Sequence, residues 1–203
     1  SRSAELLLAQ IDRFEYMLSE LLEVSRFDAG VVRLEPEILD FKVVVRRSID
    51  ALVPIAHDNR IDIHVTEPEE PISVVLDPRR IDRILRNLLI NAIEHAENKD
   101  IQVLIRATED SVAVSVRDFG VGLRKSELSR VFDRFWRADP ARARTKGGTG
   151  LGLSIAQEDA QLHGGVIEVW GEIGNGAQFT FTFPRERGQM LRDRPIPILH
   201  ILE

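Results

Sequence analysis

Three short stretches of this chain hold residues whose types and spacing could bind a phosphorylated ligand. In "TKGGTGLGLSIAQEDAQLHGG" four glycines fall within residues 147–152 and run directly into a helical pattern. Glycines let a backbone approach a ligand closely, and a helix N-terminus offers free N–H groups to an anion such as phosphate. A flexible loop would have the same composition. This stretch alone therefore leaves phosphate binding and a plain loop both open.

The second stretch is a helix expected over residues 78–96, which has an unusual polar side. Asp77 can cap its N-terminus, and Pro78 suits its first turn. One broad arc is apolar, and the opposite arc carries Asn87, Asn91, Glu94 and His95. A solvated arc would favour long charged residues over asparagine, which is a mediocre helix former. Because an amide oxygen suits Mg²⁺, the pattern favours a magnesium site, with chance polar patterning as the alternative.

The third stretch is "VRDFGVG", at the end of an alternating strand. Val112, Val114 and Val116 share one face of this strand, and Asp118 follows it. A carboxylate at a strand end can accept a hydrogen bond from an exocyclic amine such as that of adenine. The glycines after it let the backbone lie against a flat ring or a phosphate. Taken by itself, the stretch fits a glycine turn with a capping aspartate better.

The composition of the 203 residues limits the classes of function. With 43% hydrophobic and 30% charged residues, the chain is typical of a globular protein that can bury a sizeable core. Its formal net charge of -6 argues against general nucleic-acid binding. The chain has no cysteine, which excludes disulfides and thiolate metal sites. No stretch approaches the roughly 20 apolar residues of a membrane span.

The elements that must position these stretches begin with an N-terminal helix. Its apolar residues repeat at spacings of 4, 3, 4 and 3, as in the seam of a helical bundle: Leu7, Ile11, Phe14, Leu18 and Leu21. A single helix cannot bury such a seam, so we expect a second helix or a second copy of the chain against it. Packing against its own domain is the alternative. Gly30 suits the helix end, and residues 31–37 are predicted to be a linker.

The remaining elements mix helices and strands. The segment "KVVVRRSIDALVPIAHDNR" predicts one helix despite Pro54. Strands are expected at "IDIHVT", "ISVVLD", "IQVLIRA" and "SVAVSVRD", and the segment "GGVIEVWGEIGNGAQFTFTFP" predicts a hairpin that turns at residues 174–176. This grouping favours an α+β fold, a two-layer α/β sandwich with helices on one face of a mostly antiparallel sheet. The tail after Pro184 is expected to be loosely ordered.

The order of the motifs decides between these alternatives. The asparagine helix, the strand with D-x-G-x-G, "VFDRFWR", "GGTGLGLS" and the glycine hairpin follow one another within residues 38–184. In this order they resemble the ATP-binding catalytic domain of sensor histidine kinases of two-component systems. This domain has the Bergerat-type fold, shared with type II topoisomerases and a class of chaperones. The wording of the motifs is most similar to an actinobacterial type of sensor kinase.

The resemblance implies a division of the chain. The stretch "LLEVSRFDAG" resembles the end of the second helix of these kinases' dimerisation domain, which would occupy residues 1–30. Residues 31–37 would be the linker, residues 38–184 the catalytic domain, and residues 185–203 the tail.

The resemblance also implies a role for each polar motif residue. Asn91 would bind the Mg²⁺ that bridges the ATP phosphates, and Asn87 would assist it from one turn earlier. In the ATPases of the superfamily the position of Asn87 holds a glutamate that activates water. An asparagine cannot act as a base, which fits phosphoryl transfer to a side chain rather than hydrolysis. Asp118 would bind the adenine amine, while Gly120 and Gly122 shape its pocket.

Further nucleotide contacts are implied around a lid from about residue 137 to residue 148. Phe132 and Phe135 would belong to the aromatic box that anchors this lid. The other implied nucleotide-binding residues are His95, Lys146, Gly148, Thr149, Gly150, Leu151 and Gly152. The basic residues of the lid are expected to stabilise phosphate charge or to be solvated, and nucleic-acid binding is the less favoured interpretation: Arg137, Arg142, Arg144 and Lys146. His163 is expected to mark a helix end.

This sequence departs from the family pattern at three points. Glu94 stands where many members have a basic residue, so positive charge for the phosphates would have to come from the lid. Ala177 replaces a hydroxyl residue that is common after the last glycine pair, which puts one water-mediated adenine contact in doubt. The phosphoacceptor motif is missing, because no histidine is followed by an acidic residue and then arginine and proline: His57, His64, His95, His163 and His200.

The partners that the resemblance implies are ATP, Mg²⁺, an upstream dimerisation domain that carries the acceptor histidine, and a cognate response regulator. The full-length protein would be a homodimer, with this chain as a cytoplasmic part of a parent anchored in the cell membrane. No nucleic-acid partner is expected. Two alternatives stay open from the sequence: a serine kinase of the anti-sigma-factor type, and a non-catalytic module that dimerises or docks a partner.

Overall fold

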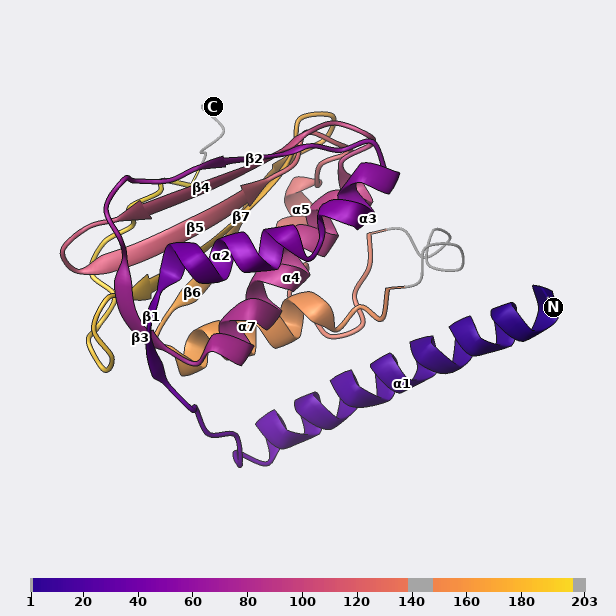
Figure 1. Ribbon diagram of the computed structural model, residues 1–203, viewed down its shortest axis with the longest axis horizontal. Coiled ribbons are helices and arrows are strands. Elements are labelled where there is room, and N and C mark those ends of the chain that lie inside the picture. Colours follow the sequence, from indigo (N-terminus) through magenta and orange to yellow (C-terminus); the bar gives the residue numbers. More distant parts are fainter. Residues whose placement is uncertain (1, 139–147, 199–203) are drawn as a thin grey trace.

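The computed structural model describes residues 2–138 and 148–198. Its helices are α1 (Arg2–Asp28), α2 (Phe41–Asp50), α3 (Val53–Asp58), α4 (Pro78–His95), α5 (Lys125–Leu128) and α7 (Gly152–Leu162). Its strands are β1 (Glu37–Asp40), β2 (Ile63–Thr66), β3 (Ser73–Leu76), β4 (Ile101–Ala107), β5 (Ser111–Arg117), β6 (Val166–Glu172) and β7 (Gly176–Pro184). Figure 1 shows a mixed domain with α1 extending beyond it.

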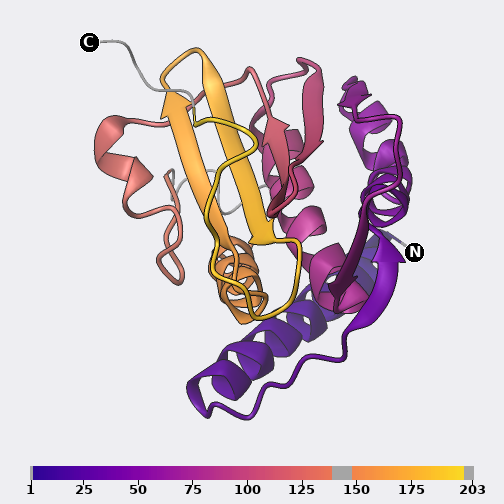
Figure 2. The ribbon, with the colours of Figure 1, turned by 90° about the vertical axis from the view of Figure 1, so that its left-hand side faces the viewer.

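The main sheet has five strands in the order β2-β4-β5-β7-β6. Only β2 and β4 are parallel, while β5 and β7 each pair with antiparallel neighbours. A separate antiparallel pair joins β1 to β3. Helices α2, α4 and α7 lie together on one face of the sheet (Figures 1 and 2). This arrangement confirms the predicted two-layer α/β sandwich with a mostly antiparallel sheet.

The helix α4 forms the centre of the helical layer, as its sequence predicts. Every residue of its apolar arc is buried: Ile81, Leu85, Leu88, Leu89, Ala92, Ile93 and Ala96. Asp77 caps the helix, accepting hydrogen bonds from the backbone N–H groups of Arg79 at 3.1 Å and Arg80 at 3.3 Å. The burial of one arc directs the opposite arc, with its asparagines, away from the core.

Two local predictions differ from the structure. The prediction of one helix across Pro54 is wrong, because the segment forms two helices that are separated at Ala51 and Leu52. Pro54 lies in the first turn of α3, where its missing N–H costs nothing, instead of inside a longer helix. Strand β1 was not predicted at all. It has only four residues and pairs outside the main sheet.

The tail over residues 185–198 forms no helix or strand, yet it packs along the sheet. It runs beside β6 and β7 in Figure 2. The Arg185 N–H donates to the Asp110 carbonyl at 2.8 Å, and Arg194 pairs with Glu168 of β6 at 2.7 Å. Ile196 is buried. The loose order expected for this tail therefore applies to its secondary structure and not to its contacts.

The helix α1 is docked on the domain through its C-terminal half. It contacts α7, and its N-terminal end points away from the domain in Figure 1. In the described part of the chain, no helix combines the length and the apolar character that crossing a membrane requires.

Candidate nucleotide-binding site

A cavity of about 530 Å³ opens beside α4 and receives most of the motif residues. Its volume lies within the range of small-molecule sites. The polar arc of α4 forms one wall of this cavity: Asn87, Asn91, Glu94 and His95. The start of α7 lies against Asn87, because a Cβ placed on Gly152 would lie 2.8 Å from the Asn87 Oδ1 atom. The asparagines and the helix start thus share one end of the cavity.

Asp118 forms the floor of the cavity, in the turn that follows β5. It is only 1% exposed, and its Oδ1 atom accepts a hydrogen bond from the Gly120 N–H at 2.9 Å. Burial raises the pKa of the Asp118 carboxyl above its ordinary value, while the backbone N–H donors and Arg117 oppose this rise. A buried carboxylate with few donors can accept a hydrogen bond from a ligand amine.

Only glycine fits at Gly120 and Gly122, because the backbone of other segments lies against both positions of this turn. A Cβ on Gly120 would lie 1.7 Å from the His95 carbonyl oxygen, so the turn packs directly on the end of α4. Gly122 has a φ of +71°, and its Cβ would lie 1.8 Å from the Glu172 carbonyl oxygen. Any side chain at either position would have to displace backbone. These glycines hold Asp118 between α4 and the β6–β7 hairpin.

The aromatic residues of "VFDRFWR" take different positions. Phe132 packs edge-on against Phe179 of β7, with ring centroids 6.2 Å apart, and Phe179 itself lines the cavity. Phe135 has a φ of +64°, is 62% exposed and is not among the cavity's lining residues. Trp136 lines the cavity instead. The turn geometry of this segment, which is neither helix nor strand, determines which ring faces inward.

The glycine-rich stretch lines the cavity beside Asn87, about two turns of α4 away from His95, on which the turn after Asp118 packs. Gly148, Thr149, Gly150 and Gly152 all line it, whereas Leu151 is fully buried at the start of α7. Arg137 also lines the cavity and donates to the Gly148 carbonyl. Lys146, Arg142 and Arg144 lie outside the described residues.

Two residues of α1 line the cavity although no sequence pattern assigned them to it. Glu20 is only 7% exposed and accepts a hydrogen bond from the Thr149 hydroxyl. Burial raises the pKa of Tyr16 to about 12, and the charge of Glu20 together with a hydrogen bond to it adds to this rise. Other lining residues that sequence reasoning missed are Val121, Val131, Trp136 and Ile173. Val121, Val131 and Trp136 belong to motif stretches, but the motifs assign roles to their neighbours and not to them, while Tyr16, Glu20 and Ile173 reach the cavity through the packing of distant segments.

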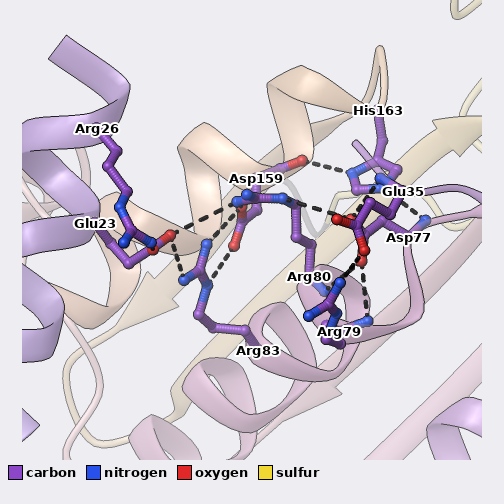
Figure 3. A network of polar contacts seen from close by, with 9 residues as sticks. All are labelled: Glu23, Arg26, Glu35, Asp77, Arg79, Arg80, Arg83, Asp159 and His163. Atoms are coloured by element: carbon purple, nitrogen blue, oxygen red, sulfur yellow. Dashed lines mark hydrogen bonds and ion pairs between the residues drawn. The ribbon is translucent and has the colours of Figure 1, made fainter. Parts of the chain in front are cut away.

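The docking of α1 on the domain uses a chain of ion pairs that Figure 3 shows. Asp159 of α7 is fully buried and pairs with Arg80 at 2.8 Å and with Arg83 at 2.7 Å. Arg83 also pairs with Glu23 of α1 at 2.8 Å. Burial raises the pKa of Glu23, but the hydrogen bond and charge of Arg83 outweigh it and leave this pKa below its ordinary value. Three helices therefore meet at one electrostatic junction.

His163 marks the end of α7, as the sequence predicts, and it joins the same region to α4 (Figure 3). Its Nε2 atom accepts a hydrogen bond from the Asp77 N–H at 3.2 Å, and its Nδ1 atom lies 2.7 Å from the Asp159 carbonyl oxygen. These partners require a neutral ring with the proton on Nδ1. Burial lowers the pKa of His163, which favours the same neutral form.

The donor set fits a nucleotide with Mg²⁺. This ion takes one or two protein oxygens and completes its octahedron with phosphate oxygens and water. The amide oxygens of Asn87 and Asn91 at the glycine-rich end of the cavity can supply such ligands. No cluster of three or more histidine, aspartate or glutamate side chains suited to a metal occurs among residues 2–138 and 148–198. A Mg²⁺ ion held by these two amide oxygens would take its other ligands from phosphate oxygens and water.

Comparison with known proteins identifies the class of domain to which this fold and cavity belong. The chain matches the family described as "Histidine kinase-, DNA gyrase B-, and HSP90-like ATPase" over residues 76–187, and it belongs to this family. The sensor histidine kinase MtrB of Mycobacterium tuberculosis is 49% identical over 197 residues, which are 97% of this chain and 35% of the relative. MtrB of Mycobacterium leprae is 48% identical over 202 residues, 100% of this chain and 36% of the relative.

A solved structure supports the same class. The crystal structure of full-length ShkA in complex with AMPPNP matches with a TM-score of 0.81 and 26% identity, covering 92% of this chain and 39% of that chain. The resemblance predicted from the motifs is thus confirmed for the family and for the fold. The serine-kinase and docking-module alternatives gain no support from these relatives. The chain spans about a third of the length of the curated relatives that it matches.

Proposed function

We propose that this chain is the ATP-binding catalytic domain of a sensor histidine kinase and that it transfers the γ-phosphate of ATP to a histidine. One observation carries the proposal: Asn87, Asn91, Asp118 and the glycine-rich stretch line the same cavity. The turn after Asp118 packs on His95 and the start of α7 lies against Asn87, so the two ends of the motif set lie about two turns of α4 apart. The likeness to a kinase structure that contains AMPPNP supports the same ligand.

At the base end, the chain would recognise adenine through Asp118. Its carboxylate would accept a hydrogen bond from the exocyclic amine, and such a bond to a charged group contributes roughly 1.5–3 kcal/mol. Gly122, Ile173 and Phe179 line this part of the cavity and can pack against the flat ring. Ala177 also lines the cavity and offers no hydroxyl to a ligand.

At the phosphate end, the chain would hold the triphosphate against the start of α7. The N–H groups of its first turn can face the phosphate oxygens, and the helix dipole adds positive potential. Asn91 would bind Mg²⁺ with Asn87 assisting, and the ion would neutralise charge that develops on the transferred phosphoryl group. Asn87 has no basic group, so the geometry favours a side-chain acceptor over activated water.

The parent protein would supply the rest of the reaction. The acceptor histidine would lie on the dimerisation domain, whose second helix ends in α1, and the phosphoryl group would pass to a response regulator. We propose a homodimeric parent that is anchored in the cell membrane, with this domain in the cytoplasm. The N-terminal seam of α1 fits such a dimer, because its apolar residues remain exposed on this chain.

Calorimetric titration with a non-hydrolysable ATP analogue, with and without Mg²⁺, tests this function. The chain should bind the analogue, and Mg²⁺ should strengthen the binding. The variant Asn91→Ala should lose this strengthening, about tenfold in affinity, because alanine offers no ligand oxygen. The matched control is Gln10→Ala, which removes an exposed amide from α1 outside the cavity. Failure of the unaltered chain to bind the analogue would contradict the proposed function, and an unchanged Mg²⁺ effect in Asn91→Ala would contradict the role of Asn91.

A further inference from the structure

A carboxylate from α1 lies where the proposed function expects negatively charged phosphates. Glu20 is buried although most residues of α1 are exposed, and it lines the same cavity as Asn87 and Asn91. Its partner Thr149 belongs to the glycine-rich stretch that leads into α7. A buried carboxylate is unfavourable unless it is hydrogen-bonded. Thr149 supplies such a bond and Tyr16 of α1 supplies another, so the docked position of α1 is also the position that places this carboxylate at the glycine-rich stretch.

The charges around the cavity make this carboxylate unfavourable for a nucleotide. Among the described residues that line the cavity, four are acidic and two are arginines: Glu20, Glu94, Asp118, Glu127, Arg124 and Arg137. Arg137 already donates to the Gly148 carbonyl. An ATP molecule would add the negative charge of its phosphates to a cavity whose described lining already has more acidic than basic side chains. Glu20 differs from the other three acids because it belongs to α1, a helix docked on the domain from outside.

The contacts that dock α1 are separate from Glu20. Glu23 pairs with Arg83 at 2.8 Å, and Asp28 accepts two hydrogen bonds from Arg134 at 2.8 Å and 2.9 Å. The Arg80 guanidinium lies 5.8 Å from the centroid of the Phe27 ring. These contacts lie between three and eight residues beyond Glu20 along the helix. They can hold α1 in place whether or not Glu20 carries a charge.

We propose that Glu20 is a regulatory carboxylate that competes with the nucleotide phosphates, so that docking of α1 lowers the affinity of the cavity for ATP. The inference rests on the proposed function and deepens it. When α1 moves away, Glu20 leaves the cavity and the phosphate end gains affinity. Because binding and docking oppose each other, ATP also favours the undocked position of α1 to the same degree. A movement of the bundle helix in the parent protein would thereby control nucleotide binding.

The variant Glu20→Gln separates the charge from the contact. Its amide oxygen can still accept the Thr149 hydroxyl bond, while the negative charge is lost. The matched control is Glu15→Gln, which removes the same charge from an exposed position on the same helix. Calorimetry then measures the affinity of both variants and of the unaltered chain for the non-hydrolysable ATP analogue and for adenosine, each with Mg²⁺.

The expected result is about tenfold tighter binding of the ATP analogue to Glu20→Gln, with adenosine affinity unchanged and Glu15→Gln like the unaltered chain. Equal analogue affinities in all three proteins would overturn this inference alone. Weaker analogue binding by Glu20→Gln would also overturn it, because Glu20 would then be a ligand of Mg²⁺. An equal gain for adenosine would overturn it too, because adenosine has no phosphates with which Glu20 could compete. If the analogue binds none of the three, the proposed function fails as well.

A double-variant cycle tests whether the effect depends on docking. Asp28→Asn weakens the pair with Arg134 and so loosens α1 without touching the cavity. It should raise the affinity for the ATP analogue about twofold to threefold in the unaltered chain. In the Glu20→Gln background it should add nothing, since the carboxylate that docking introduces is gone. An equal gain in both backgrounds would contradict a role for docking through Glu20.

Discussion

Asp118 illustrates how a single residue of this site is held ready for a ligand. The two glycines that follow it let the turn pack on the backbone of α4 and of the β6–β7 hairpin, and the carboxylate is buried there. Burial raises its pKa because the charged form loses solvation. A ligand amine would restore part of that solvation as a hydrogen bond. The raised pKa and the nucleotide role thus have one physical cause, the closed glycine turn.

The variant Asp118→Asn should weaken binding of the ATP analogue at least tenfold and leave the fold intact. Asparagine keeps the size and one acceptor oxygen but loses the charge that strengthens the bond to the adenine amine, roughly 1.5–3 kcal/mol. Calorimetric titration measures the loss, and circular dichroism checks the fold. Asp58→Asn, an exposed position at the end of α3, is the control and should bind normally. Unchanged affinity in Asp118→Asn would mean that the base lies elsewhere.

The sequence predicts a residue of this site where the local helix or strand determines which way its side chain points. Asn87 and Asn91 follow from the helical period of α4, and all residues of its apolar arc are indeed buried. Glu20 and Ile173 could not be predicted in this way, because they reach the cavity from α1 and from a hairpin turn that are far away in sequence. Phe135 and Trp136 are adjacent in an irregular turn, where no period indicates which ring faces inward.

At the scale of elements, the junction of α1, α4 and α7 depends on one buried acid. Asp159 has no exposed surface and accepts hydrogen bonds from Arg80 and Arg83, which project from successive turns of α4. Arg83 extends the contact to Glu23 of α1. The position of α1 beside the cavity is therefore coupled to the packing of α4 on α7, the two helices that carry the asparagines and the glycine-rich stretch.

The variant Asp159→Asn should destabilise the chain by about 2–3 kcal/mol. It removes the buried charge that Arg80 and Arg83 share and leaves Glu23 as their remaining common partner, and breaking a fully buried pair costs about 3–5 kcal/mol. The cost is smaller here because both arginines are partly exposed. Urea unfolding followed by circular dichroism measures it. The control Asp133→Asn, in a solvent-exposed pair with Arg130, should change stability by less than about 1 kcal/mol. Equal effects would show that Asp159 is not a structural centre.

Some helices and strands of this fold can be predicted from the sequence, and others cannot. The bounds of α4 follow from Asp77 and Pro78, which act directly on the helix start. Strand β1 escaped notice because four residues are too few for a pattern, and its pairing partner β3 lies more than thirty residues away. The break between α2 and α3 was also missed, although Pro54 signalled it. Propensity indicates the type of an element more reliably than its interruptions.

At the scale of the whole molecule, α1 has two surfaces with different uses. Its C-terminal half is docked through Glu23 and Asp28, while Glu20 reaches into the cavity and bonds to Thr149. The apolar seam remains exposed along the rest, with Leu7 at 65% and Phe14 at 56%. Packing against its own domain therefore does not replace the helix partner that the seam predicts. A helix that presents an apolar seam to a partner helix and a side chain to the cavity can transmit a movement from that partner to the cavity.

The chain as it stands should bind ATP and yet fail to label itself. Phosphoryl transfer needs an acceptor held in line with the γ-phosphate at near-attack distance, and proximity contributes roughly 7–11 kcal/mol to lowering the barrier. None of the five histidines lies in an acceptor motif, and His163 is a buried neutral residue that already bonds to Asp77 and lies against Asp159. Incubation with radiolabelled ATP should therefore leave residues 1–203 unlabelled.

Adding a separate fragment with the upstream helix of the dimerisation domain and its acceptor histidine should restore labelling on that fragment. The label should be lost in acid and survive in alkali, as phosphohistidine does. A chain with Asn91→Ala serves as the control and should not label the fragment, since it lacks the magnesium ligand. Stable label on residues 1–203 in the absence of any fragment would contradict this division of labour. It would mean that the acceptor lies within this chain, and that the bundle helix does more than position the nucleotide domain.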